Sequence, residues 1–295
     1  MTSVVFVSGT GRCGTNIMRE ILSHHPMITS HPFAYKFIVD PDGIVDFYNS
    51  ATRSWSPYII DSKLRRLETF LKALAKRGDD EEIYVDWELN EYFPNYEKRV
   101  DKLLGDLVDF KYVGVHHGLP SERLIYFMGY KRRSELAYIL GDFIKDVINS
   151  HLEEVGKEIY VDEGTHSILF ANEILGFLPT KFIHMVREPM DVIASLSNQR
   201  WVPKDKIKAA KWYKYVIDRL KVIKYGLPRG SIITVDLYDL VGNTRKVLTE
   251  VCDFIGIPFN EKMLEVDLSK SRKDRWKEEF SVDELKTIQR VLDAV

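Results

Sequence analysis

The chain has 295 residues, 45% hydrophobic and 29% charged, a balance typical of folded globular proteins that excludes a disordered chain. A formal net charge of -2 creates no overall basic field, so we expect no nucleic-acid partner. We expect instead a small ligand, or a larger one that is bound only through a local part of its surface. Two cysteines are too few for a disulfide framework, no leader pattern opens the chain, and no apolar run reaches the roughly 18 residues of a membrane span. We therefore expect a complete cytoplasmic protein with no membrane partner.

Near the N-terminus an apolar segment runs into a glycine-rich turn, and a helical pattern follows directly. Gly9 and Gly14 have the spacing of the phosphate-binding loop G-x-x-x-x-G-K-[ST], in which backbone N–H groups and a helix N-terminus bind an anion. Thr15 and Asn16 replace the Lys and Ser/Thr of that loop, and Arg12 places a fixed cation within it. This pattern predicts a site for a phosphate-like group unlike that of ordinary ATP or GTP hydrolysis; the alternative is a simple chain reversal.

Short β-branched segments alternate with helical patterns along the chain, which favours an α/β fold with a parallel sheet. Strands are predicted at Val4–Ser8, Ile83–Asp86, Tyr112–Val115, Ile159–Val161, Lys181–Val186 and Ile232–Val235. Helices are predicted behind the glycine turn, around Leu64–Leu74, around Val100–Val108 and over Leu136–Ile148, the last with Ser134 as its N-cap.

No repeat, low-complexity tract or linker divides the sequence, so we predict a single domain over residues 1–295. The region from about 34 to 130 is rich in aromatic residues and has no sharp motif. Because ligands gather at the carboxyl ends of strands in α/β folds, we expect this region to be an insertion that sets ligand specificity. The simpler interpretation is that most of its aromatic residues pack the core.

A second candidate site follows the predicted strand Lys181–Val186. Arg187 lies at the carboxyl end of that strand, Pro189 suits a first helical turn, and Ser195 lies within the helix. A guanidinium and a hydroxyl in this arrangement can bind a phosphate. A salt bridge between Arg187 and Asp191 at the start of the helix is an equally good interpretation, and the local sequence leaves both open.

Four motifs, in order along the chain, resemble those of sulfotransferases that use 3′-phosphoadenosine 5′-phosphosulfate (PAPS). Residues 9–16 resemble the 5′-phosphosulfate loop of that family, typically R-S-G-T-T, and residues 182–195 are similar to its 3′-phosphate motif. Residues 238–241 followed by 251–259 resemble its "EDL … FLGLPF" segment, and residues 272–280 its "RKG…GDWK…F" element. On these motifs the chain is identified as a member of that family.

The resemblance implies a P-loop NTPase-like fold of three layers, with a central parallel sheet flanked by helices, and transfer of a sulfuryl group from PAPS. The acceptor would be a hydroxyl, or less favourably an amine, of an unidentified small or locally gripped molecule, the insertion would select it, and PAP would be the product. The 5′-phosphosulfate would be held by Gly11, Arg12, Cys13, Gly14, Thr15 and Asn16, and the 3′-phosphate by Arg187, Ser195, Arg272 and Lys273. No metal is expected, because these protein donors would neutralise the anion and Arg12 would stabilise the charge that develops in transfer.

The base that collects the acceptor proton is less well defined. Where related enzymes carry a Glu after the first helix, this chain has His31, whose unperturbed pKa of about 6.5 suits a base; the alternative is a solvated loop histidine. Glu163 occupies the place of a family Lys, so it acts as an acid or base, orients His31 or the acceptor, or is structural, while Lys36 could supply the missing cation. Glu88 and Glu91 are further base candidates.

Two other functions remain open. A divergent P-loop phosphotransferase fits the spacing of Gly9 and Gly14, although the absence of Lys at position 15 argues against it. A non-catalytic nucleotide-binding protein fits the departures from the family at His31 and Glu163. The sequence gives neither the acceptor nor the oligomeric state.

Overall fold

The computed structural model describes residues 4–31, 36–76, 87–115, 120–268 and 273–294. The chain divides into two compact units. The first comprises Met1–Ala34, Lys157–Asn172 and Pro179–Val295, and the second comprises Tyr35–Gly156 and Glu173–Leu178. The strand predicted at Ile83–Asp86 lies outside the described residues.

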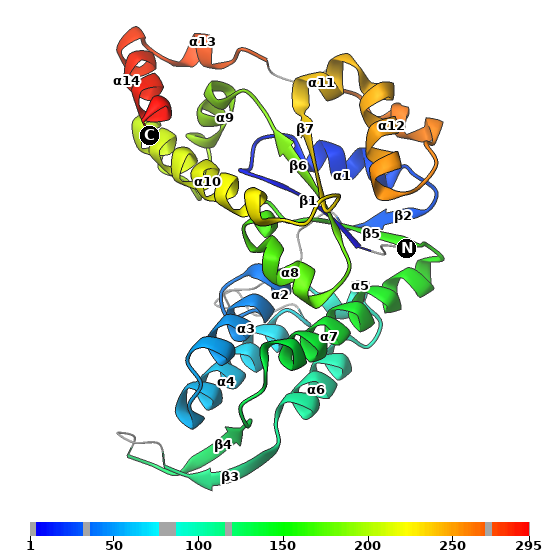
Figure 1. Ribbon diagram of the computed structural model, residues 1–295, viewed down its shortest axis with the longest axis vertical. Coiled ribbons are helices and arrows are strands. Elements are labelled where there is room, and N and C mark those ends of the chain that lie inside the picture. Colours follow the sequence, from blue (N-terminus) through cyan, green and yellow to red (C-terminus); the bar gives the residue numbers. More distant parts are fainter. Residues whose placement is uncertain (1–3, 32–35, 77–86, 116–119, 269–272, 295) are drawn as a thin grey trace. The chain divides into compact units, whose positions relative to one another are not determined.

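The first unit is built on a five-stranded sheet in the order β2-β5-β1-β6-β7, in which all neighbouring strands are parallel (Figure 1). Its strands are β1 (Val4–Gly9), β2 (Ile28–Ser30), β5 (Ile159–Glu163), β6 (Lys181–Val186) and β7 (Ile232–Asp236). The strands predicted at the places of β1, β5, β6 and β7 are confirmed. β2 was not predicted, because its three residues are too few to give a pattern. Because the strands are parallel, their carboxyl ends share one edge of the sheet.

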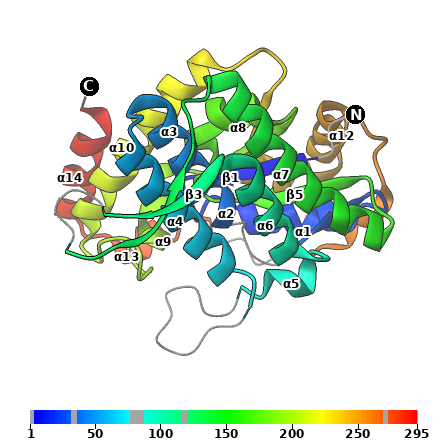
Figure 2. The same ribbon diagram turned by 90° about the horizontal axis from the view of Figure 1, so that it is seen from below.

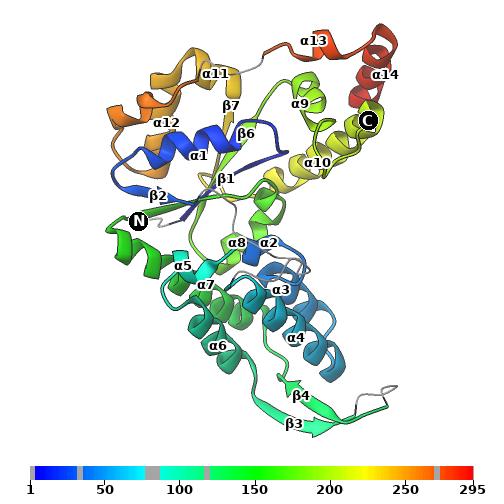
Figure 3. The same ribbon diagram turned by 180° about the vertical axis from the view of Figure 1, so that it is seen from behind.

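The helices of the first unit are α1 (Thr15–Ser23), α9 (Pro189–Leu196), α10 (Lys206–Gly226), α11 (Leu237–Gly242), α12 (Thr244–Ile255), α13 (Trp276–Glu279) and α14 (Val282–Asp293), with short 3₁₀ turns η1 (Ser167–Phe170) and η2 (Glu261–Glu265). Alternate residues of β1 face opposite sides of the sheet, as the period of a strand requires. Val5 and Val7 belong to the core formed with residues of α1, α9 and α12, whereas Phe6 on the other face stacks on Phe182 with ring centroids 5.3 Å apart. Figure 3 shows these three helices of the first unit from behind. The fold is a mixed α/β fold with a parallel sheet flanked by helices, as predicted.

The second unit is mainly helical. It contains α2 (Lys36–Val39), α3 (Ile44–Arg53), α4 (Pro57–Ala73), α5 (Leu89–Tyr92), α6 (Tyr96–Leu107) and α7 (Arg133–Val155), and α8 (Ala171–Phe177) runs into it from the first unit's segment. A hairpin of β3 (Phe110–Gly114) and β4 (Arg123–Phe127) completes it, and α6 packs along α7 (Figure 2). The four helices predicted from the sequence correspond to α1 in the first unit and to α4, α6 and α7 in the second.

Two details of this unit differ from the sequence predictions. The strand predicted at Tyr112–Val115 is β3, which pairs antiparallel with β4 in a separate sheet. The connection to β4 is too short for the crossover that a parallel pair needs, which is about a dozen residues or more. Ser134 is not the N-cap of α7: the helix begins at Arg133, and the extended backbone of Arg132 forms the cap.

The region expected to be an insertion, about 34 to 130, falls in the second unit, which continues to Gly156 and includes residues 173–178. The description as a single domain stays a prediction. Among the described residues, none of the helices has the length and apolar character required to cross a bilayer.

Candidate anion-binding site

The glycine-rich turn after β1 is anchored to the end of β5. The hydroxyl of Ser8 donates to the carbonyl oxygens of Gly164 (2.6 Å) and Thr165 (2.9 Å), and the N–H of Gly9 donates to the Thr165 carbonyl oxygen at 2.9 Å. Ser8 and Gly9 are buried. These bonds hold the start of the turn at the carboxyl edge of the sheet, where ligands of α/β folds bind.

Three residues of the turn have left-handed backbone conformations: Gly11 (φ 80°), Arg12 (φ 58°) and Gly14 (φ 98°). This curvature brings the chain into α1 at Thr15, with Gly14 as an N-cap that has no side chain to cap the helix. The first turn of α1 contains no acidic residue. The first N–H groups of α1 and the positive end of its dipole therefore suit an anionic ligand.

Cys13 contributes to the turn through its backbone. Its side chain is buried, and burial raises the pKa of the thiol. A Cβ atom at Gly9 would lie 2.5 Å from Cys13 Sγ and 2.7 Å from the Met185 carbonyl oxygen, so the thiol fills the space that a larger residue would need. Cys13 is thus a packing residue whose N–H remains in the predicted anion site.

Residues predicted to hold two different phosphate groups contact one another. The Nε of Arg12 donates to the hydroxyl of Ser195 at 2.9 Å. Arg187 Nη1 lies 3.4 Å from the backbone carbonyl oxygen of Arg12, to which it donates. Two guanidinium groups and a hydroxyl, from the turn after β1 and from the segment that runs from the end of β6 into α9, therefore converge beside the turn.

Arg187 is held by Tyr238, whose role the sequence analysis missed, and by Asp191, which it considered as a salt-bridge partner. Its Nε donates to the hydroxyl of Tyr238 at 3.0 Å, and that hydroxyl donates to the carboxylate of Asp191. Arg187 Nη2 lies 3.8 Å from Asp191, so the salt bridge considered as an alternative is present. Asp191 is fully buried and also accepts the backbone N–H of Asp274 at 3.1 Å. The signal for Tyr238 was its place in the motif at 238–241.

Tyr238 is partly buried and lies among charged groups. Burial, followed by the hydrogen bond to Asp191, raises the pKa of Tyr238 to about 12. Lys273 Nζ lies 5.2 Å from the centroid of the Tyr238 ring, so the predicted lysine does come to this cluster. Arg272 lies outside the described residues.

Glu163, in β5, contacts Asn16 in the first turn of α1. With its amide nitrogen toward β5, Asn16 donates to the two carboxylate oxygens of Glu163 at 3.1 and 3.2 Å. Glu163 is the last residue of β5 and is buried. The contact links the strand that anchors the turn to the helix that follows it.

His31 lies directly after β2 and is buried, so it is not the solvated loop histidine that was the alternative. Its ring packs edge-on against Tyr160, with centroids 5.5 Å apart, and its carbonyl oxygen accepts Arg19 Nη1 at 3.2 Å. Because side chains alternate along β5, Tyr160 and Glu163 point to opposite faces of the sheet. The ring of His31 and the carboxylate of Glu163 therefore lie on opposite faces.

The remaining candidates belong to the second unit. Glu88 and Glu91 belong to the second unit, at the start of α5. Lys36 begins α2, and its side chain lies outside what the structure describes.

Two aromatic residues beside the turn were missed by the sequence analysis. His166 follows the anchoring residue Thr165, and its ring centroid lies 6.2 Å from that of Trp201 and 5.6 Å from that of Trp212. Trp201 in turn approaches Gly11, where an added Cβ would lie 2.7 Å from its Cη2 atom. The place of His166 shortly after β5, at the carboxyl edge of the sheet, could have marked it as a candidate site residue. The place of Trp201 in the sequence gave no such indication.

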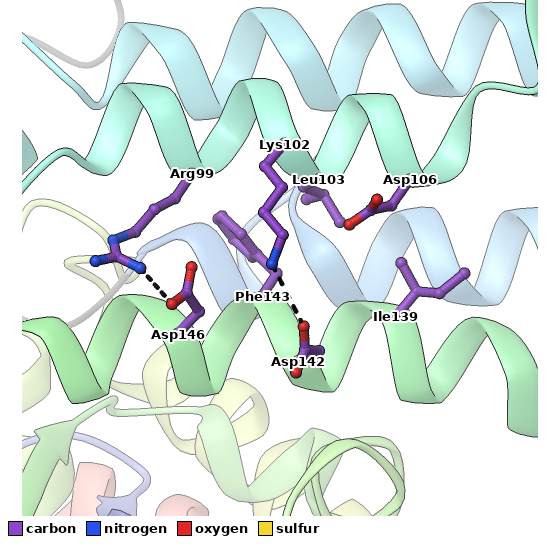
Figure 4. A pocket seen from close by; sticks show the side chains of 8 residues that line it. All are labelled: Arg99, Lys102, Leu103, Asp106, Ile139, Asp142, Phe143 and Asp146. Carbon is purple, nitrogen blue, oxygen red and sulfur yellow. Dashed lines mark ion pairs between the residues drawn. The ribbon is translucent and has the colours of Figure 1, made fainter.

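A cavity in the second unit does not provide an alternative site. It lies between α6 and α7, where Lys102 is 3.8 Å from Asp142 and Arg99 pairs with Asp146 (Figure 4). Its volume of about 10 Å³ is at most that of one water molecule. Within the described ranges, no group of three His, Cys, Asp or Glu side chains could hold a metal ion.

Comparison with known proteins gives a consistent result. The model of the Sulfotransferase family matches residues 4–261. A sulfotransferase domain from the Synechococcus PCC 7002 olefin synthase has 15% identity and a TM-score of 0.50, with 100% of this chain and 96% of that one covered. Sulfotransferase STF1 from Mycobacterium tuberculosis H37Rv has 11% identity and a TM-score of 0.50, with 100% and 77% covered. No curated protein matches the chain. The fold is thus the P-loop-like fold of these structures.

Proposed function

Because the chain belongs to the sulfotransferase family, we propose that it transfers a sulfuryl group from PAPS to the hydroxyl group of a small acceptor, an amine being less favoured. The observation that carries this proposal is the convergence of Arg12, Arg187 and Ser195 beside an uncapped helix N-terminus. Two guanidinium groups beside a helix N-terminus can together bind a ligand that carries two neighbouring anionic groups. PAP would be the product.

The donor set also fits binding of the nucleotide without a metal. The N–H groups at the start of α1 and the guanidinium of Arg12 would hold the 5′-phosphosulfate. Arg187, Ser195 and Lys273 would hold the 3′-phosphate, for which Arg187 would exchange part of its interaction with Asp191. Guanidinium groups bind phosphate oxygens in a bidentate manner, which a lysine cannot do.

In the proposed reaction the acceptor oxygen forms a bond to sulfur while the bond between sulfur and the bridging phosphate oxygen breaks. The bond's electron pair leaves with PAP, and the acceptor proton passes to a base. The two oxygens must be in line, and the charge that develops on the leaving oxygen needs fixed donors. Arg12 and the backbone N–H groups of the turn would supply these donors.

Two histidines are proposed as alternative bases. His31 is the base that the sequence predicts, and it is buried at the carboxyl edge of the sheet. His166 is connected to the turn through one residue, because its ring packs against Trp201, which in turn lies against Gly11. Glu163 would position Asn16 at the start of α1.

The experiment that tests the proposal is a comparison of PAP and ATP in calorimetric titrations, each with and without Mg²⁺. Metal-independent binding of PAP, tighter than that of adenosine 5′-monophosphate, is expected. Mg²⁺-dependent binding of ATP with no preference for a 3′-phosphate would instead indicate the phosphotransferase. Transfer of ³⁵S-sulfate from PAPS to any acceptor in a broad screen would exclude the non-catalytic alternative.

We also propose a cytoplasmic location. Cys13 and Cys252 are both free and buried, which suits a reducing compartment.

A further inference from the structure

Trp201 lies against the apex of the anion-binding turn. A Cβ atom built on Gly11 would be 2.7 Å from Trp201 Cη2 and 3.1 Å from Thr165 Cγ2. The indole therefore occupies the space in which any larger residue at position 11 would place its side chain. This contact brings a residue beyond α9 back to the turn that follows β1.

The indole of Trp201 is supported by two other rings. The ring centroid of Trp212 lies 5.6 Å away at an interplanar angle of 68°, and that of His166 lies 6.2 Å away at 80°. At these angles neither ring is stacked face to face on the indole. Trp201 nevertheless is 49% exposed, which is unusual for a large aromatic residue in such a cluster. A fixed, half-exposed indole is a suitable surface for a planar ligand.

Trp201 and the second arginine contact different residues of the turn. Arg12, next to Gly11, directs its guanidinium to Ser195 and carries the carbonyl that Arg187 contacts. Thr165 and Trp201 instead meet at Gly11. If the nucleotide contacts the two arginines and Ser195, the acceptor approaches opposite the leaving oxygen, in line with the breaking bond, and we assign Trp201 at Gly11 to that approach.

We propose that Trp201 is a specificity-determining residue that stacks on a planar ring of the acceptor, and that the acceptor is an aryl alcohol. This inference rests on the proposed sulfuryl transfer. Aromatic pairs contribute about 0.5–1.5 kcal/mol beyond the area that they bury, which favours an aryl ring over a saturated one. A phenolic hydroxyl, with a pKa of about 10, also gives up its proton to a histidine more readily than an aliphatic hydroxyl does.

The test uses the full chain saturated with PAP and titrated with 2-naphthol, with cyclohexanol as the saturated comparison. Trp201→Ala should weaken binding of 2-naphthol about 3- to 10-fold, the range that loss of one aromatic pair predicts, and Trp201→Phe should restore most of it. Affinity for PAP should stay within about twofold of wild type, since the indole is not assigned to the nucleotide. Tyr225→Ala, at a tyrosine that is 96% exposed on α10, is the matched control and should change neither affinity.

Three results would overturn the inference while leaving the proposed function intact: naphthol binding unaffected by Trp201→Ala, cyclohexanol bound as tightly as 2-naphthol, or no naphthol binding to a protein that binds PAP. An equal loss of PAP and naphthol affinity would place Trp201 on the nucleotide side and overturn it as well. Failure of the wild-type protein to bind PAP would contradict the proposed function itself.

Discussion

The guanidinium of Arg12 donates to the hydroxyl of Ser195 across 183 residues of sequence, at 2.9 Å. The sequence motifs assign these residues to different phosphate groups of one nucleotide. Their contact means that the two subsites adjoin and share donors. A change at either residue should therefore affect both groups of the ligand.

Arg12→Ala should weaken PAP binding about 10- to 100-fold, because hydrogen bonds to charged groups contribute about 1.5–3 kcal/mol. Arg12→Lys should have an intermediate effect, since lysine keeps the charge and loses the planar fork. Isothermal titration calorimetry measures both. Arg229→Ala, at an exposed arginine after α10, is the control and should bind PAP as wild type does. Equal affinities for the Arg12 and Arg229 variants would remove Arg12 from the site.

Tyr238→Phe should destabilise the protein. The change deletes the hydroxyl that donates to the fully buried Asp191 and accepts from Arg187. Loss of a partner for a buried charged group costs about 1–3 kcal/mol, which urea denaturation can measure. Tyr225→Phe, in which the lost hydroxyl is exposed, should be neutral. If both variants unfold at the same urea concentration, the Tyr238 hydroxyl does not stabilise Asp191.

His184 should make stability depend on pH. Burial, followed by the charge of Lys224, lowers the pKa of His184 from 6.5 to about 4, and Lys224 Nζ lies 3.2 Å from its Nδ1. The folded state thus favours the neutral ring, so the contribution to stability is present above pH 6.5 and is lost as pH falls through 4. The loss should approach roughly 3 kcal/mol.

Melting temperatures of wild type and His184→Gln between pH 7.5 and 4 check this dependence. The variant should lose less stability over that range than wild type. Lys224→Met should reduce the dependence only in part, because burial is the larger cause of the lowered pKa. Identical slopes in wild type and His184→Gln would contradict the prediction.

Gly11→Ala should disturb the structure around its position more than Gly230→Ala does. Gly11 and Gly230 both have φ 80°, so alanine would adopt an unfavourable left-handed φ at each. A Cβ at Gly230 meets nothing within 4 Å, whereas one at Gly11 meets Trp201. Tryptophan fluorescence should therefore shift in Gly11→Ala only, and PAP affinity should fall with it. A spectrum like that of Gly230→Ala would show that Trp201 does not pack on the turn.

The base can be identified by separating turnover from binding. His31→Ala and His166→Ala should both spare PAP affinity, and the one that removes the base should lower kcat about 100-fold or more. It should also abolish the acidic limb of the pH–rate profile. Glu163→Gln keeps a hydrogen-bond partner for Asn16 and should reduce kcat less. If neither histidine variant changes kcat, the proton passes to another group.

Much of the sheet could be predicted because its central strands are apolar and flanked by turn residues. Val4–Gly9 and Lys181–Val186 have this pattern, whereas Ile28–Ser30 is too short to show it. The anion-binding turn was also predictable, because glycines at fixed spacing before a helix have a local physical meaning. The antiparallel pairing of β3 was not, since register and partner depend on the connection rather than on the strand itself.

The side-chain network of the site could not be read in the same way. Asp191 and Tyr238 come from separate segments and meet only when β6 and β7 pair. Trp201 has no helical or strand pattern around it, and its contact with Gly11 depends on how the segment after α9 returns. Residue types at the ends of strands can be anticipated from a sequence; which of them touch is a property of tertiary packing.

The strand order has a consequence for synthesis on the ribosome. β1 is made first, but both of its neighbours, β5 and β6, begin about 150 residues or more later. At about 5–20 residues per second, roughly 10 to 35 seconds pass between completion of β1 and completion of β6. Until the chain has passed β5, the glycine-rich turn also lacks the carbonyl of Thr165 that anchors it. The nascent N-terminus, although it carries the most recognisable motif, can acquire its binding conformation only after most of the chain has left the ribosome.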